Sequence, residues 1–436
     1  FPPPPRPPPL LRSLVGSEMC IRDSYKIKMA ERFDVLVQGI SEQEALSLLL
    51  AQTSTVQRPA DRYFAATRLG LSKTEESLDA LLTATTKLNI DELYDRITRR
   101  KAIESLGRRK DKRAIPALTN VLTCTDTEAV INAINALVRI DWDPSEEDKD
   151  LLLSLLNGEC TLVRAVIQAH TRLNIQHSKA EKLIAELCDH EQALIAGAAR
   201  AYQAKLYGKT ELLNPLESQL LNLTAGKRRS AVIDLGDARD PNRIQSLVDA
   251  PISMSLRANS CFQIIDDQSA LQQKNFNSQL EVLLTDNPKH LKIRSEWQCD
   301  PNPEEIERCL SHRDEAIQYG AALSLMNLNS EDCLQIINSM EERLWSDYVT
   351  HYYLTCIVGL RQFSEKSYLV RSALAETTPQ YTKSRVAAAW ACLKLDLYDQ
   401  LDLLYQLSSS AYWKPLRWSC QQVFARLIDK QQVSNK

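Results

Sequence analysis

A helix–turn–helix unit of about thirty residues recurs along this chain and restricts its fold more than any other feature. The clearest copy covers residues 91–120, where an amphipathic helix leads through a basic turn over 108–113 into a second helix with Pro116 in its first turn. Gly107 is expected to end the first helix. Because a helix pair of this size cannot bury its own apolar face, it requires further copies of itself to pack against.

Those copies are visible in two repeated signals. An Ala-x-x-x-x-Gly frame occurs at residues 65–70, 102–107 and 231–236. Arginines also precede similar apolar segments, separated by intervals close to multiples of about 30 residues. These arginines are Arg100, Arg164, Arg229, Arg257, Arg385 and Arg417. The pattern predicts an all-α fold, an α-solenoid of stacked HEAT-like helical repeats of the armadillo type.

The domain organisation follows from shifts in composition. Residues 1–28 combine a proline run with a segment that resembles translated sequencing adapter, and they are expected to be non-native. Residues 29–436 are then expected to form a single α-solenoid that starts at Met29. The acidic stretch 141–150 offers an alternative division into halves, 29–142 and 150–436.

Charge and cysteine usage exclude several classes of function. The formal net charge is −3, which disfavours binding to nucleic acid, because such binding depends on neutralising phosphates. No apolar run reaches the ~18 residues of a membrane span. The cysteines occur singly, with no Cys-x-x-Cys, so we expect free core thiols in a reducing cytoplasm and no metal site.

Residues 344–360 form the second informative stretch. On a helix, Asp347, Tyr348, His351 and Tyr352 are expected to share one exposed face. A carboxylate beside a histidine is suited to proton transfer near neutral pH, which favours a binding or catalytic surface. The alternative is that the tyrosines pack on neighbouring repeats and the histidine is an ordinary surface residue.

Arginines and tryptophans are the other candidates for binding. The residues alone favour a structural role for an arginine row, in which it bonds helix ends and carboxylates of adjacent repeats. The alternative is that the row holds carboxylates of a ligand. The stretch 286–303, which contains Trp297, has clusters of Pro and Asn and is expected to be a loop. That loop either contacts a ligand or simply joins two repeats.

Standard catalytic motifs are absent from the sequence, but a family resemblance is present. No Gly-x-Ser-x-Gly, phosphate-binding loop, His-Glu-x-x-His or Gly-x-Gly-x-x-Gly occurs. The runs at 61–70, 91–118 and 128–140 resemble the HEAT-repeat phycobilin lyases of the E/F clan. The start at Met29 and the stretch 344–360 are similar, more narrowly, to single-chain phycoerythrin α-subunit lyases and lyase-isomerases.

The resemblance implies a chromophore-attaching enzyme of the cytoplasm. It implies phycoerythrobilin as substrate, no permanent cofactor, and as partner the phycoerythrin α subunit, whose cysteine would form a thioether with the bilin. Some such enzymes also isomerise the bilin to phycourobilin. The resemblance leads us to expect Asp347, His351, Tyr348 and Tyr352 to be catalytic. The expected bilin-binding residues are Arg100, Arg164, Arg229, Trp297 and Trp345. The alternatives are a non-catalytic scaffold and a bilin carrier.

Overall fold

The chain folds into two units built from helices. The computed structural model describes residues 39–52, 55–56, 58 and 60–434, and contains no strand within these ranges. The first unit ends at Leu212 and the second begins at Leu213. The predicted all-α architecture is confirmed, whereas the proposed non-native segment 1–28 and the start at Met29 lie outside the described residues.

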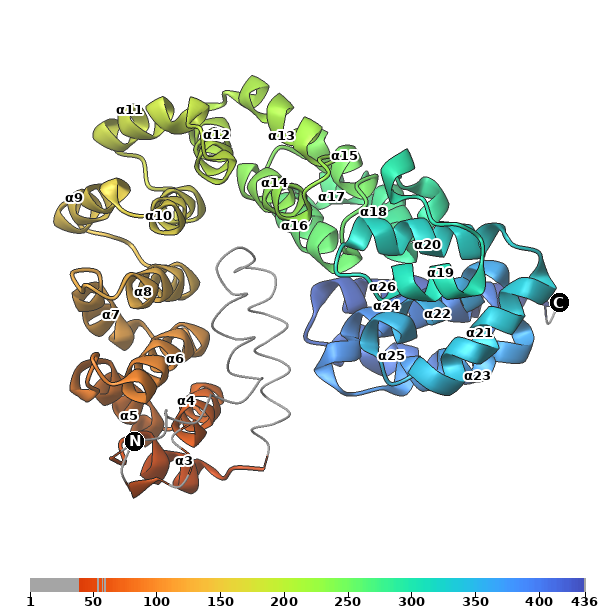
Figure 1. The fold of residues 1–436 in the computed structure, drawn as a ribbon, viewed down its shortest axis with the longest axis horizontal. Coiled ribbons are helices and arrows are strands. Elements are labelled where there is room, and N and C mark those ends of the chain that lie inside the picture. The colour runs from red at the N-terminus through yellow and green to blue at the C-terminus, as the bar shows by residue number, and fades with distance from the viewer. Residues whose placement is uncertain (1–38, 53–54, 57, 59, 435–436) are drawn as a thin grey trace, which may run out of the picture. The chain divides into compact units, whose positions relative to one another are not determined.

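The first unit is a stack of helix pairs (Figure 1). Its even-numbered helices form one layer, in which each contacts the next, and its odd-numbered helices pack beside them. The bounds are α3 (Glu42–Leu49), α4 (Asp61–Leu71), α5 (Glu75–Lys87), α6 (Leu93–Arg109), α7 (Ile115–Val121), α8 (Thr127–Ile140), α9 (Glu146–Ser154), α10 (Cys160–Arg172), α11 (Ser178–Glu186) and α12 (Ala193–Tyr207).

The acidic stretch 141–150, which the sequence offered as a possible point of division, lies inside this first unit. Trp142 is only 5% exposed and belongs to the apolar core. Ser145 then starts α9 with a reciprocal cap, in which its hydroxyl accepts from the backbone of Asp148. A stretch that is anchored in this way continues the stack.

The second unit contains further helix pairs, but contacts also join its early and late helices. The bounds are α13 (Asn214–Gln219), α14 (Ala225–Ala238), α15 (Ile244–Val248), α16 (Met254–Asp266), α17 (Ala270–Lys274), α18 (Asn277–Thr285), α19 (Pro303–Leu310), α20 (Glu315–Asn327), α21 (Ser330–Leu344), α22 (Tyr348–Arg361), α23 (Ser367–Ala375), α24 (Thr382–Lys394), α25 (Leu401–Ser410) and α26 (Lys414–Ser434). Helix α18 packs on α24, and α26 packs on both α16 and α18.

The expectation that Gly107 ends a helix is wrong, since α6 continues to Arg109. A side chain at Gly107 would instead collide with α8, because its Cβ would lie 2.6 Å from the Cα of Ala136. Gly359 has the same role in the second unit, where a Cβ would lie 2.8 Å from the Cα of Ala391. The repeated glycine therefore allows adjacent helices to approach closely.

Candidate functional site

Helix α22 begins at the stretch that the sequence analysis identified, and Asp347 is its N-cap. The Oδ1 atom of Asp347 accepts hydrogen bonds from the backbone N–H groups of Val349 at 3.1 Å and Thr350 at 2.9 Å. Tyr348, the next residue, is 43% exposed. These two residues are the accessible part of the predicted face.

His351 is buried, so the expectation of one exposed face is wrong for this residue and for Tyr352. The imidazole lies against the ring of Trp345 with centroids 4.0 Å apart, and the ring of Tyr381 lies 4.7 Å away on the start of α24. Tyr381 is fixed in turn, because its hydroxyl donates to the carbonyl of Ser346 at 2.6 Å. The helices that pack against α22 cover a face that helical periodicity alone suggested to be open.

Burial also sets the protonation state of His351. Desolvation lowers its pKa to about 4, and the carboxylate of Glu376 opposes this shift only in part. The imidazole is therefore neutral at pH 7. Its Nδ1 atom is buried and has no hydrogen-bond partner. A neutral imidazole with a free ring nitrogen can accept a proton from a ligand that reaches it.

Tyr352 belongs to a buried polar cluster. Its hydroxyl donates to the carboxylate of Asp286, which also accepts from the Tyr319 hydroxyl at 2.7 Å and pairs with Arg257. The guanidinium of Arg257 donates to Tyr319 at 3.1 Å and to the backbone carbonyls of Val248 and Ile252. Desolvation by burial raises the pKa of Tyr352 well above its usual value, so the phenol stays protonated.

Lys383 links this cluster to the start of α24, and the sequence analysis missed it. Its ammonium lies 3.8 Å from the ring centroid of Tyr352 and 5.5 Å from that of Tyr353. No local motif marks Lys383, Tyr381 or Glu376. Asp286 also gave no signal beyond its place in an Asp-Asn-Pro break, because its partners are up to 66 residues away in the sequence.

The three candidate arginines all bond to protein groups near the start of another helix. Arg100 pairs with Asp126, the N-cap of α8, through two nitrogens at 2.5–3.1 Å. Arg164 donates to the carbonyl of Leu194 at 2.6 Å, in the first turn of α12. Arg229 forms a bidentate pair with Glu315 of α20. These contacts match the structural role expected for the arginine row.

Trp297 packs inside its loop and is 3% exposed. The guanidinium of Arg228 lies 4.8 Å from its ring centroid, and that of Arg294 lies 5.8 Å away. A Cβ at Gly320 would lie 1.7 Å from the carbonyl oxygen of Trp297, so the loop backbone lies directly on α20. The stretch 286–303 is irregular as predicted, with only short 3₁₀ turns, but it is firmly seated.

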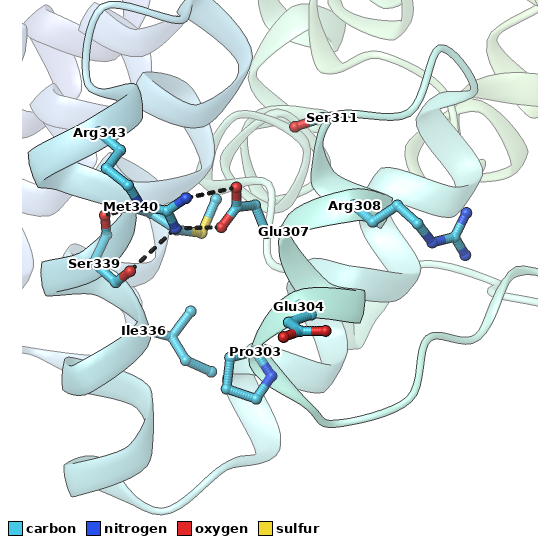
Figure 2. A pocket seen from close by; sticks show the side chains of 9 residues that line it. All are labelled: Pro303, Glu304, Glu307, Arg308, Ser311, Ile336, Ser339, Met340 and Arg343. Carbon is cyan, nitrogen blue, oxygen red and sulfur yellow. Dashed lines mark hydrogen bonds and ion pairs between the residues drawn. The ribbon is translucent and has the colours of Figure 1, made fainter.

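A pocket of about 500 Å³ lies between α19 and α21, the helix that leads into Trp345 (Figure 2). Its apolar surface comes from Pro303, Ile336 and Met340. Arg343 and Glu307 form an ion pair across it, with Nη2 2.5 Å from the nearer carboxylate oxygen. The Arg343 side chain is 53% exposed, so a competing carboxylate can exchange for Glu307 at low cost.

Comparison with known proteins finds a repeat family that matches part of the chain and several relatives. A family model described as HEAT repeats matches residues 86–171. An uncharacterised phycocyanin operon protein Y from Pseudanabaena tenuis is 25% identical over 361 residues, which are 82% of this chain and 85% of that protein. The bilin biosynthesis protein CpeY from a Synechococcus species is 25% identical, over 77% of this chain and 80% of its own. The bilin biosynthesis protein PecE from a Nostoc species is 26% identical, over 56% of this chain and 93% of its own.

None of the helices in the described ranges combines the length and the apolarity that a bilayer crossing requires.

Proposed function

Because this chain belongs to the E/F clan of HEAT-repeat phycobilin lyases, we propose that it attaches a bilin to a cysteine of a phycobiliprotein. The bilin is phycoerythrobilin and the acceptor is a phycoerythrin α subunit. The observation that carries this proposal is the length of the similarity, since one relative matches over 82% of the chain and a named bilin biosynthesis protein over 77%.

The chemistry is the addition of a thiol across a double bond. The acceptor sulfur bonds to the ethylidene carbon of bilin ring A, and the thiol proton is balanced by a proton gained by the tetrapyrrole, so nothing leaves. A free bilin is flexible and reacts without selectivity. The protein therefore acts mainly by holding one bilin conformation against one cysteine.

The start of α22 supplies groups suited to holding a bilin and transferring a proton to it. Both hydrogen bonds of Asp347 to its helix use Oδ1, so Oδ2 can accept from pyrrole N–H groups. Trp345 and Tyr348 offer aromatic surface for the tetrapyrrole rings. A bilin that displaces Trp345 reaches the neutral imidazole of His351, which can relay a proton.

Arg343 is the best placed group for a bilin propionate. It lies on α21, two residues before Trp345, beside the 500 Å³ pocket, and its pair with Glu307 is exposed to solvent. Arg229 is a poorer candidate because a propionate would have to displace Glu315 from a pair with side chains only 11% and 15% exposed. Arg100 and Arg164 would likewise have to release partners within the first unit.

Co-expression with phycoerythrobilin biosynthesis enzymes and a phycoerythrin α subunit tests the proposal. We expect the purified acceptor to carry a covalent chromophore that absorbs green light. A blue-absorbing product means that the protein also isomerises the bilin to phycourobilin. An uncoloured acceptor, with bilin bound to this protein, would favour the carrier; with no bilin on either protein it would favour the scaffold.

Single variants test the proposed residues. Asp347→Asn and His351→Phe should each lower the yield of coloured acceptor by tenfold or more, as loss of a positioned acid–base group does. Arg343→Gln should weaken bilin binding. Arg371→Gln is a matched control, because Arg371 is also an exposed arginine paired with a carboxylate, that of Asp399. Equal yields from Arg343→Gln and Arg371→Gln would remove Arg343 from the site.

A further inference from the structure

Two thiols and a carboxylate converge beside α19, although the sequence analysis predicted isolated cysteines and no metal site. The Sγ atoms of Cys299 and Cys309 and a carboxylate oxygen of Glu305 all lie within 4.8 Å of one another. The two cysteines are ten positions apart, which matches no standard metal-binding spacing. The loop that precedes α19 brings them together, so only the tertiary structure reveals the cluster.

The three side chains are held in place by their surroundings. Glu305 and Cys309 are four residues apart on α19 and share one face of it. Cys299 comes from the loop, where its carbonyl accepts from the Ser324 hydroxyl at 2.5 Å. The contact of the Trp297 backbone with Gly320 fixes the loop two residues earlier. The cluster therefore has little freedom to lose when it binds an ion.

Arg308 balances the charge of this cluster. Two thiolates, one carboxylate and a divalent cation together carry one negative charge. The Arg308 guanidinium donates to both oxygens of Glu305, at 2.9 and 2.5 Å, and lies 3.7 Å from the sulfur of Cys309. Thiolate and carboxylate ligands together suit Zn²⁺, with a water molecule as the fourth ligand of a tetrahedral site.

We propose that Cys299, Glu305 and Cys309 form a zinc-binding site. Binding forms two Zn–S bonds and one Zn–O bond, and it releases two thiol protons to solvent. A zinc ion there would tie the loop to α19, whose opposite side lines the 500 Å³ pocket. The site is independent of the proposed lyase activity, because its evidence is the ligand geometry alone.

The geometry of the free cluster also favours an ion over a disulfide. The Cys309 thiol is directed at Glu305, 3.4 Å from Oε1. A disulfide would involve the two sulfurs alone, whereas the carboxylate that converges on them supplies a third ligand atom for an ion.

The test is metal titration of the full-length protein, reduced with a thiol-free reductant. We expect one equivalent of Zn²⁺ to bind, and Co²⁺ in its place to give a thiolate-to-metal charge-transfer band. Cys299→Ser and Cys309→Ser should each abolish the band, and Glu305→Gln should weaken Zn²⁺ binding by about tenfold or more. Cys124→Ser, which alters a partly exposed thiol of the first unit, is the control and should bind Zn²⁺ normally.

Thermal unfolding provides a second readout. Zn²⁺ should raise the melting temperature of the unaltered protein and of Cys124→Ser, but not that of Cys299→Ala. The proposal is overturned if Zn²⁺ binds equally to the double variant of Cys299 and Cys309, or if the unaltered protein binds none. It is also overturned if oxidised glutathione closes a disulfide in a protein that never binds Zn²⁺.

Discussion

The two units use the same helix pair but connect their helices differently. In the first unit, the main contacts join helices that are neighbours in the stack. In the second unit, α26 also packs on α16 and α18, which precede it by more than 100 residues. Trp413 donates to Asn259 at 2.9 Å, and the rings of Trp418 and Phe262 lie 6.2 Å apart. One unit is a linear stack and the other returns upon itself.

This difference explains where the charged groups lie. In the linear stack one partner of an ion pair stays accessible even where the other is buried. Asp95 opposite the buried Arg62 is 16% exposed, and Arg100 opposite Asp126 is 30% exposed. When helices return upon one another, groups at the ends of early helices become enclosed. Arg257 and Asp286 are each 1% exposed and depend on each other and on two tyrosines. Closure of the second unit therefore encloses a polar cluster, and the unit is stable only while each group of this cluster keeps its partners.

The largest expected effect distinguishes a fully buried ion pair from a partly exposed one. Asp286→Asn removes the charge opposite the buried Arg257 and should lower the free energy of unfolding of the second unit by about 3–5 kcal/mol. Asparagine tolerates the left-handed backbone at this position, where φ is +49°, so backbone strain adds little to the cost of the substitution. Hydrogen exchange of α16 and α18 measures the change.

The matched variant in the first unit is Arg100→Gln, which breaks a partly exposed pair and leaves the Asp126 cap in place. It should cost about 1 kcal/mol or less. Equal costs for the two variants would contradict the distinction between the units.

The next effect concerns the buried histidines, His351 in the second unit and His170 in the first. Burial lowers the pKa of both, to about 4 for His351. Between pH 6.5 and 4 the unfolded chain takes up protons that the folded chain refuses, so stability falls as pH falls. Loss of this contribution from His351 should reach about 3 kcal/mol near pH 4.

The variants His351→Phe and His170→Phe test this pH dependence, because phenylalanine keeps an aromatic ring at each position but has no group that takes up a proton. Each should flatten the pH dependence of hydrogen exchange in its own unit and leave the other unit unchanged. A pH profile of the second unit that is the same with and without His351 would refute the assigned protonation state.

The glycines give a smaller but well matched comparison. Gly107→Ala and Gly359→Ala each place a methyl group against the next helix and should cost about 1–3 kcal/mol. The cost should be higher at Gly359, because a linear stack can widen at one interface while a closed unit cannot. Urea unfolding of both variants, followed by circular dichroism, measures the difference. A cost at Gly107 equal to or higher than that at Gly359 would contradict this expectation, because the second unit would then relax at least as easily as the first.

The smallest effect tests which contacts close the second unit. Arg426 on α26 pairs with Glu281 on α18, and both side chains are more than a third exposed. Arg426→Gln should cost less than about 1 kcal/mol, the same as Arg113→Gln at the exposed pair with Glu75 in the first unit. Thermal unfolding compares the two variants. A much larger loss from Arg426→Gln would mean that this ion pair, rather than apolar packing, holds the closure.

The sequence by itself determined the fold class and the recurring unit. Periodic apolar residues, the glycine frame and the regularly spaced arginines are local or evenly repeated signals, and stacked repeats express such signals directly. The family resemblance over residues 91–118 likewise rests on one continuous stretch, so it is visible in the sequence alone. The sequence also placed Trp345, Asp347, Tyr348 and His351 around the start of one helix, where the structure has them.

Only the tertiary structure decided which of these side chains are accessible and which groups meet. Helical periodicity places Asp347, His351 and Tyr352 on a related face, but the helices packed against α22 bury two of the three. Asp286 and Tyr352, like Cys299 and Cys309, are brought together by loops and by the return of the chain, which leave no periodic trace in the sequence. Contacts between distant residues depend on the packing of whole helices, and a single sequence does not encode that packing position by position.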